Sequence, residues 1–492
     1  MNIIKKGFPL SQPQMRIWYT EKMYPHISIG NITGIMRLKE RLDLELLKES
    51  IQLLFKNCET LRIRITEEDG YPSQYVEDYC YKEVLHYHFQ NEFELDNWAQ
   101  KQAEVPFIIL NKDLIEISVF TLGNNETGFL VKMHHLISDA WTMTLIGDML
   151  IKYYSCLLYN EPVQNESEHS YKEYVEQEIK YIESEKINKS KEFWKNKFIS
   201  LPETTKFNFK SGAENLSSKR ISFSLNDKLV KGIADYCKKE GISVNTYFLS
   251  ILNIYLSHVT REDDLTILTS VHNRNSPKDR RTLGMYISTV PFRTQLSPEL
   301  SFTSFAKKIA SEQFAVYRHQ KYPYNFLAQN IRELHKTSIH ELCQVLFSYQ
   351  NAKFVNQQYD FQTKWYFNGY QETPIIIHIN DRENNGQMII DFDYRIDSFD
   401  ESNIEDIYKK ICILIELSLK NPDVQLNKFE MLTQVERKQI VCEFNQTAAP
   451  FSKEKTLSQI FEEQVEKHPE RIAVTCEDQS LSYTELNERA NQ

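Results

Sequence analysis

Two adjacent histidines followed by an acidic residue are the strongest chemical signal in the sequence. They lie in residues 129–148, FLVKMHHLISDAWTMTLIGD, where an apolar run ends in His134 and His135 and is followed by Asp139. A neutral imidazole has a pKa near 6.5 and can therefore take a proton from an attacking amine at pH 7. Taken alone, the pattern leaves two interpretations open, a proton-accepting site or two structural histidines at a strand end.

The elements around these residues form a strand, a tight turn and a helix. The apolar run of residues 128–133 predicts a strand, and residues 141–158 predict a helix. Ser138 and Asp139 suit the start of that helix because their side-chain oxygens accept the free amides of its first turn. Alternation along the strand directs His134 and His135 to opposite faces. Asp139 is open to two interpretations, a plain helix cap or a charged partner for an arginine.

The hydrophobic pattern predicts mixed α/β structure in two large regions joined by a charged, mostly helical stretch at 167–197. The first region has expected strands at 32–38, 61–65, 73–76, 116–122 and 128–133, and expected helices at 42–56 and 141–158. The second has expected strands at 219–223, 265–270, 345–349, 375–379 and 388–394, and expected helices at 227–240, 244–260 and 402–419. Beyond residue 428 we expect helices at 429–444 and 457–467 and a strand at 471–476.

Composition excludes several classes of protein. The 492 residues suffice for about three domains, and the net charge of −10 argues against a binder of duplex nucleic acid. None of the 8 cysteines is close to another in sequence, and no zinc or phosphate-loop motif occurs, so we expect no metal site. No apolar run approaches the roughly 18 residues of a membrane span, and no signal peptide is evident, so we expect a cytoplasmic protein without a membrane span.

The histidine motif resembles the HHxxxDG signature of the condensation domains of nonribosomal peptide synthetases, with Ala140 at the final glycine. Six further segments resemble motifs of that family in the same order, at residues 10–18, 58–64, 170–174, 283–289, 319–323 and 342–347. The resemblance implies an α/β fold of two chloramphenicol-acetyltransferase-like lobes in a V-shaped pseudo-dimer. We place the lobes at 1–175 and 176–427, a linker at 428–453, and the truncated start of an adenylation domain at 454–492, where LSYTELN resembles the first core motif of that domain.

The resemblance also assigns roles to individual residues. The histidine pair is assigned to catalysis, His135 acting on the reactants and His134 supporting the turn. Asp139 is expected to pair with Arg62, and Ala140 completes the structural support of the site. The remaining candidates are tunnel residues, namely Trp18, Tyr19, Trp141, Tyr286 and Ser288.

Residues 16–22, 24–26 and 271–274 look like the starter subclass of lipopeptide synthetases, and Met1 lies only ten residues before the opening motif. This implies transfer of a fatty acyl group from acyl-coenzyme A to an amino acid held on the phosphopantetheine arm of a carrier protein. The expected partners are that carrier and an adenylation domain, with no permanently bound cofactor. Three alternatives stay open, a non-catalytic recruiting module of the same fold, an epimerisation domain, and an ordinary condensation domain whose donor arrives in trans.

Overall fold

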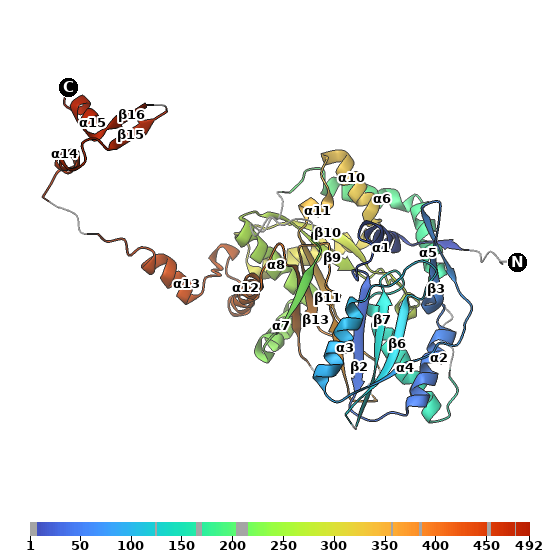
Figure 1. The fold of residues 1–492 in the computed structure, drawn as a ribbon. Coiled ribbons are helices and arrows are strands. Elements are labelled where there is room, and N and C mark those ends of the chain that lie inside the picture. The colour runs from blue at the N-terminus through green and yellow to red at the C-terminus, as the bar shows by residue number, and fades with distance from the viewer. Residues whose placement is uncertain are drawn as a thin grey trace. The chain divides into compact units, whose positions relative to one another are not determined.

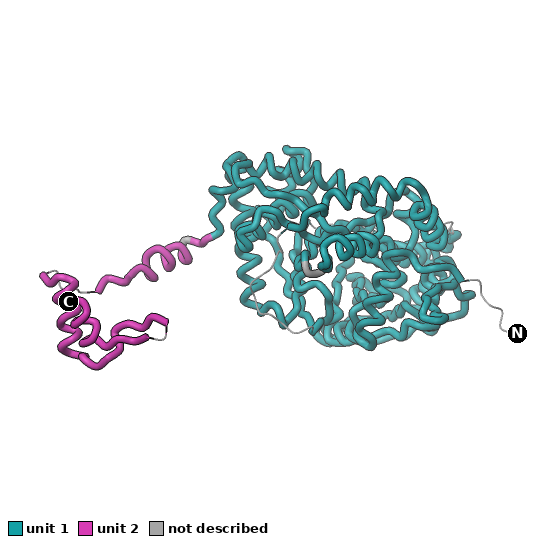
Figure 2. Tube along the Cα trace, turned by 90° about the horizontal axis from the view of Figure 1, so that it is seen from above, with its two compact units in different colours: residues 1–431 teal, residues 432–492 magenta. Residues whose placement is uncertain are grey.

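The computed structural model describes residues 7–123, 125–163, 170–202, 215–355, 358–382, 386–449, 454–477 and 479–492. Residues 167–169 of the expected charged stretch and 450–453 of the expected linker lie outside these ranges. Met1–Met431 form one compact unit and Leu432–Gln492 a second (Figure 2). The histidine motif lies in the first unit, which contains two large sheets with their helices (Figure 1).

The first large sheet positions the histidine motif. Its five strands follow one another in the order β12 (Phe361–Tyr366), β2 (Asn31–Leu38), β7 (Glu126–His134), β6 (Ile115–Leu122) and β5 (His86–Phe89). Strand β7 is central and ends at His134, opposite Asn31 of the antiparallel strand β2. The strands expected at 32–38, 116–122 and 128–133 are therefore confirmed to within two residues.

Both faces of this sheet are covered, because successive side chains point to opposite faces and apolar residues occupy both. Met36, Phe129 and Val131 belong to a core shared with the helices of one face, whereas Ile35 and Leu130 pack with a helix on the other. The surrounding helices are α1 (Gln12–Met23), α2 (Leu44–Asn57), α3 (Glu92–Glu104) and α4 (Ala140–Leu158). A small sheet of β1 (Phe8–Pro9), β4 (Tyr71–Val76) and β3 (Ile63–Glu68) lies beside them.

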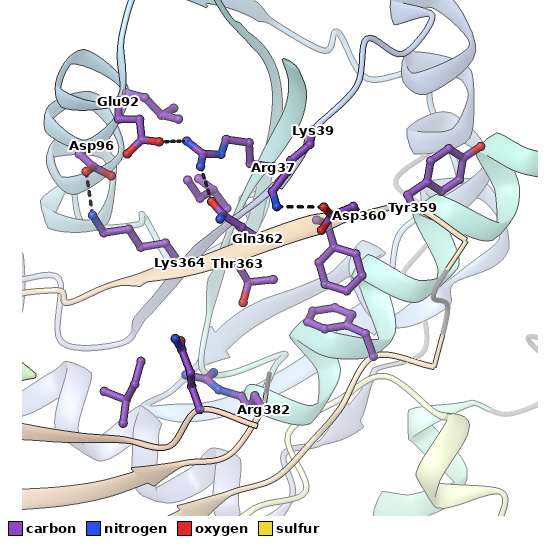
Figure 3. Close-up of a pocket in the computed structure, with 16 residues that line it drawn as sticks. Arg37, Lys39, Glu92, Asp96, Tyr359, Asp360, Gln362, Thr363, Lys364 and Arg382 are labelled. Carbon is purple, nitrogen blue, oxygen red and sulfur yellow. Dashed lines mark hydrogen bonds and ion pairs between the residues drawn. The ribbon is translucent and has the colours of Figure 1, made fainter. Parts of the chain in front are cut away.

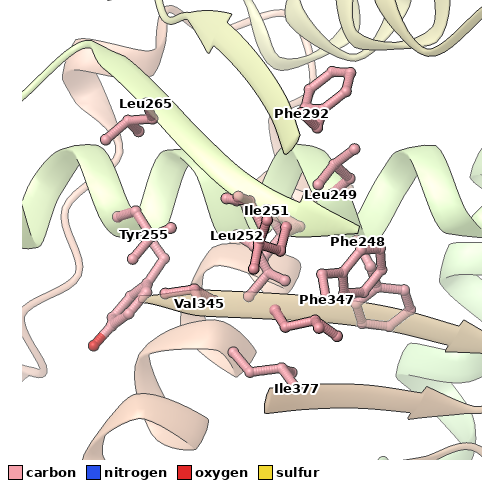
Figure 4. Packing of buried hydrophobic residues seen from close by; sticks show 14 of the residues in the cluster. Phe248, Leu249, Ile251, Leu252, Tyr255, Leu265, Phe292, Val345, Phe347 and Ile377 are labelled. Atoms are coloured by element: carbon pink, nitrogen blue, oxygen red, sulfur yellow. The ribbon is translucent and has the colours of Figure 1, made fainter. Parts of the chain in front are cut away.

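The second large sheet has six strands. Their order is β10 (Ser288–Gln295), β9 (Asp264–Val271), β11 (Val345–Gln350), β13 (Ile375–Asn380), β14 (Ile389–Arg395) and β8 (Ser218–Ser224). One face packs on α8 (Val244–Thr260), whose Leu249 and Leu252 belong to the same apolar cluster as Phe347 and Ile377 (Figure 4). The alternate residues of β13 and β14, among them His378 and Asp391, instead line a cavity. One face of this sheet is thus a core and the other a polar wall.

The remaining helices of the first unit connect or cover the two sheets (Figure 1). They are α5 (Tyr171–Ile182), α6 (Lys186–Lys197), α7 (Asp227–Glu240), α8 (Val244–Thr260), α9 (Phe302–Arg318), α10 (Tyr324–His335), α11 (Ile339–Leu342) and α12 (Glu401–Lys420). The charged stretch expected to be mostly helical is confirmed as α5 and α6 within the described residues. Helices α7, α8 and α12 also agree with the expected ranges.

Strand β12 departs from the expected lobe boundaries. It lies between β11 and β13 in sequence, yet it pairs antiparallel with β2 of the first sheet, Phe361 opposite Leu38 and Tyr366 opposite Thr33. The range 176–427 therefore contributes one strand to the sheet of the first lobe. Hydrophobic pattern did not reveal this strand, because its sequence FQTKWY places three consecutive polar residues between aromatic ones and shows no alternation over its six positions.

The second unit is small. It contains α13 (Gln434–Lys438), α14 (Leu457–Lys467), α15 (Tyr483–Ala490) and the hairpin of β15 (Ile472–Cys476) and β16 (Gln479–Ser482). The helix expected at 429–444 is shorter, since α13 is followed by one π-helical turn, Gln439–Glu443. Among the residues that the structure describes, no helix is long and apolar enough to cross a lipid bilayer.

Candidate active site

The turn between β7 and α4 is built as the sequence predicts. Asp139 is the N-cap of α4, and its carboxylate accepts a hydrogen bond from the backbone amide of Thr142 at 2.7 Å. Ala140 is the first residue of that helix and is not among the described residues with positive φ. A Cβ therefore costs no backbone strain at the position where the family signature has glycine.

Asp139 forms a buried ion pair, but its partner is Arg274. Nη2 of Arg274 lies 3.0 and 3.1 Å from the two carboxylate oxygens, and both side chains are almost fully buried. The backbone amide of Tyr286 donates to the same carboxylate at 3.2 Å. Arg274 donates further hydrogen bonds to the carbonyl oxygens of Thr282 and Gly284. The pair thus connects α4 to the segment of the second lobe between β9 and β10.

The predicted pairing of Asp139 with Arg62 is wrong. Arg62 ends a short 3-10 helix, and its guanidinium donates to the carbonyl oxygens of Phe55 and Glu77 within the first lobe. Those backbone acceptors hold the side chain away from the histidine turn. The arginine that pairs with Asp139, Arg274, is the last residue of the segment 271–274, VHNR. From the sequence alone, this segment indicates only the starter subclass.

One ring nitrogen of His135, Nε2, is free to accept a proton. Its Nδ1 lies 3.3 Å from the carbonyl oxygen of Ser138, which can only accept, so Nδ1 carries the proton and Nε2 keeps its lone pair. Burial is the main cause that lowers the pKa of His135 to about 4, and the neighbouring His134 is the second cause. The Asp139 carboxylate acts in the opposite direction. The imidazole is therefore neutral at pH 7.

A cavity of about 370 Å³ contains His135. Of the predicted tunnel residues, Trp141 and Ser288 line it, and so does Ala140. Its apolar lining includes Ile17, Ile32, Met285, Ile287, Leu346 and Ile376. The space is bounded by α1, the histidine turn and the inner face of the second sheet, so both lobes contribute to it.

The other predicted tunnel residues lie elsewhere. Trp18 is 1% exposed and belongs to the core of the first lobe, because it occupies the inner face of α1. Tyr19, the next residue along that helix, is 53% exposed on the outer face. Tyr286 is buried with its ring 4.1 Å from the Arg274 guanidinium, so it supports the ion pair. For these three residues the tunnel prediction is wrong.

The polar wall of the cavity was not predicted from the sequence. Arg220 forms two hydrogen bonds with Asp393, at 2.6 and 2.7 Å, and Nε2 of His378 lies 3.1 Å from the same carboxylate. Burial alone would raise the pKa of Asp393, but the Arg220 charge and the hydrogen bonds from Arg220 and His378 together outweigh burial and hold that pKa well below its usual range. Regular alternation on β8, β13 and β14 is the signal that could have identified this wall.

Segments that resemble separate family motifs meet behind the cavity. The Tyr171 hydroxyl donates to the carbonyl oxygen of Met285 at 2.6 Å and lies 2.9 Å from the Ser11 hydroxyl. Thr60 donates to the carbonyl oxygen of Leu283 at 3.0 Å. These contacts join the motif segments at 10–18, 58–64, 170–174 and 283–289 into one support for the site.

A larger cavity of about 640 Å³ contains none of the predicted site residues. It borders β12 and α3, and its charged side chains form the pairs Arg37 with Glu92 and Lys364 with Asp96 (Figure 3). These cations are already paired with carboxylates. Among the described residues, no group of three or more histidine, cysteine or acidic side chains could hold a metal ion.

Comparison with known proteins agrees with this architecture. Residues 4–441 match the family model described as Condensation domain, and the chain belongs to that family. Its fold is therefore the mixed α/β, chloramphenicol-acetyltransferase-like fold of condensation domains, as predicted.

Two of the relatives are subunits of bacterial synthases. The chain is 31% identical to surfactin synthase subunit 1 of Bacillus subtilis strain 168, over 98% of the chain and 14% of the relative. It is 30% identical to one of the plipastatin synthase subunits of the same strain, over 99% of the chain and 19% of the relative. The chain thus spans less than a fifth of the length of either relative.

Solved structures share the fold at low identity. One is a variant of the starter condensation domain of rhizomide synthetase in complex with C8-CoA, with a TM-score of 0.78 and 16% identity, covering 87% of this chain and 98% of that one. Another is the first condensation domain of the CDA synthetase, with a TM-score of 0.78 and 17% identity, covering 87% and 99%.

Proposed function

We propose that this chain is a starter condensation domain, which transfers a fatty acyl group from acyl-coenzyme A to an aminoacyl thioester on a carrier protein. The observation that carries the proposal is the placement of His135, a neutral base on the wall of a cavity formed by both lobes of a condensation fold. The starter assignment is supported by the segments 16–22 and 271–274, from which Arg16 and His272 line that cavity.

The reaction is a direct transfer between two substrates. The amine nitrogen attacks the thioester carbonyl carbon, the carbon–sulfur bond breaks, and the sulfur leaves as the coenzyme A thiolate. Nε2 of His135 accepts the proton that the amine loses and returns it to the thiolate, so atoms and charge balance. No covalent enzyme intermediate is needed, because holding the amine beside an activated thioester supplies much of the acceleration.

The cavity suits this pair of substrates. A fatty acyl chain can pack against the apolar side chains of Ile17, Met285 and Ile287. Binding in the cavity removes water from the reacting groups, which favours the neutral amine and keeps the His135 imidazole unprotonated. The chemistry requires no resident cofactor.

The proposal extends to the partners of the chain. The acceptor amino acid arrives on the phosphopantetheine arm of a carrier protein of the same synthetase. Residues 454–492 are the start of an adenylation domain, since residues 481–487 resemble its first core motif. Within this segment, Ser482 caps α15 in a capping box with Glu485.

A donor competition tests the proposal. The chain is incubated with an aminoacyl carrier protein, a series of acyl-coenzyme A donors and a peptidyl thioester on a second carrier, and the carriers are weighed by mass spectrometry. We expect the mass of the acceptor to increase by one fatty acyl group. A carrier whose amino acid is N-acetylated is the control and must gain nothing.

Either of two results would overturn the proposal. Transfer of the peptidyl group alone would identify an ordinary condensation domain. Binding of the carrier with no product from any donor would identify a non-catalytic recruiting module.

A further inference from the structure

One face of α1 contacts the histidine turn. Gln14, Trp18 and Glu21 are spaced by four and three residues, so they share the buried face of that helix. The amide of Gln14 donates to the carbonyl oxygen of Leu136 at 2.7 Å. Oε1 of Glu21 lies 3.0 Å from Nε2 of His134. A helix with two buried polar residues on its inner face therefore holds both ends of the segment 134–136.

The hydrogen bonds of His134 determine its tautomer. The backbone amide of Leu136 donates to Nδ1 at 3.1 Å, so Nδ1 must carry a lone pair and a neutral ring must carry its proton on Nε2. That N–H points at Glu21, whose carboxylate accepts it. Both side chains are buried, with 2% and 7% exposed, so water is not an adequate substitute for the carboxylate.

The His134–Glu21 pair also contacts the backbone that holds His135. A Cβ built on Gly30 would lie 2.2 Å from Nε2 of His134 and 2.6 Å from Oε1 of Glu21, so the glycine leaves the space that the pair occupies. The carbonyl oxygen of the same Gly30 accepts the backbone amide of His135 at 2.7 Å. A displacement of the pair would therefore act directly on Gly30, the residue before β2 whose carbonyl oxygen holds the backbone amide of His135.

We propose that Glu21 is a positioning residue for the condensation reaction. Its carboxylate accepts the Nε2 proton and fixes the orientation of His134, and through His134 and Gly30 it fixes the position of the His135 imidazole. This inference rests on the proposed function, in which His135 accepts the proton of the amine. Glu21 also borders the cavity, so its effect on substrate binding is measured separately.

The test compares variants that differ in their ability to accept a hydrogen bond. Glu21→Gln keeps an acceptor oxygen at the same reach, and we expect it to retain at least about a third of the wild-type kcat. Glu21→Met has a similar length and no adequate acceptor, and we expect kcat to fall by about 30-fold or more with KM for both substrates changed less than about threefold. Glu67→Met removes the ion pair of the neighbouring Lys22 outside the cavity and serves as the control.

A spectroscopic readout separates positioning from a general structural defect. In ¹⁵N-histidine NMR spectra we expect wild type and Glu21→Gln to show His134 protonated on Nε2 with a similar Nε2 chemical shift, and Glu21→Met to show a displaced Nε2 shift because the hydrogen-bond acceptor is lost. This readout does not depend on turnover, so it tests the Glu21 contact even where the proposed reaction fails. If Glu21→Met does not fold, Glu21→Asp, whose carboxylate is one methylene too short, is expected to lose about tenfold in kcat.

Two results would overturn the inference. One is a wild-type kcat in Glu21→Met or Glu21→Asp. The other is a wild-type spectrum in which His134 carries its proton on Nδ1.

Discussion

His135 is a neutral imidazole with a free lone pair on Nε2, because its proton lies on Nδ1 and burial disfavours a second proton. The Ser138 carbonyl fixes the proton on Nδ1, and burial, aided by His134, lowers the pKa to about 4 from 6.5. Since the unfolded chain binds this proton near pH 6.5, the folded state loses stability as the pH falls from about 6.5 towards 4. Above that window the imidazole is neutral and ready to accept a proton.

The first prediction concerns this titration. We expect the ¹⁵N signals of His135, assigned by comparison with His135→Ala, to remain those of a neutral ring down to about pH 5. The exposed His88 provides an internal comparison in the same spectra. A midpoint near 6.5 for His135 would show that burial does not control its charge.

The ion pair of Asp139 with Arg274 gives a second prediction at the scale of residues. Removing one partner leaves the other charge buried and unpaired, so Arg274→Ala should lower the free energy of unfolding by about 3–5 kcal/mol. In urea unfolding, a double-mutant cycle of Asp139→Ala with Arg274→Ala should show strong coupling.

The matched cycle uses Arg62→Ala in place of Arg274→Ala. Because Arg62 bonds to the backbone of its own lobe, we expect its effect to add to that of Asp139→Ala without coupling. Strong coupling to Arg62 and none to Arg274 would contradict the geometry.

At the scale of elements, hydrophobic pattern predicted the strands and helices that carry either a regular apolar face or a long apolar run. Helices α4, α7 and α12 have such a face, and strand β7 and helix α8 have such a run. The pattern missed α1, whose inner face carries Gln14 and Glu21 because these residues serve the histidine turn. It also missed β12, since the partner of that strand is about 330 residues away in sequence. Neither the polar contacts of α1 nor the distant pairing of β12 produces a regular apolar spacing in the local sequence.

Gly284 tests the loop behind the site. Its φ is +148°, and an added Cβ would lie 2.2 Å from the ring of Tyr171. We therefore expect Gly284→Ala to lower the free energy of unfolding by more than about 2 kcal/mol, since backbone strain and overpacking each cost about 1–3 kcal/mol. Urea unfolding measures the difference.

The control substitution is Gly241→Ala at the end of α7. Its φ is +67°, but no atom lies within 4 Å of the added Cβ, so only the strain term of about 1 kcal/mol remains. Equal costs at the two glycines would mean that the packing of Tyr171 on the loop does not constrain this position.

At the scale of the whole molecule, the cavity depends on contacts that join distant parts of the chain. Arg16 of α1 donates to Thr289 of β10 at 2.7 Å, and Thr20 donates to Glu372 at 2.6 Å. The motif resemblance predicted the fold and selected His135 as the residue for the proposed chemistry. It did not give the correct partner of Asp139, because several arginines follow strands or turns and only the three-dimensional arrangement distinguishes Arg274 from Arg62.

The most direct measurement is the single-turnover rate of amide formation with saturating acyl-coenzyme A and aminoacyl carrier protein. Loss of a general base typically costs 10²–10⁴-fold, so His135→Ala should be slower than wild type by at least about 100-fold while keeping its unfolding temperature. His88→Ala, outside the cavity, should match wild type. A folded His135→Ala protein that forms the amide as fast as wild type would contradict the central claim that this imidazole accepts the proton of the amine.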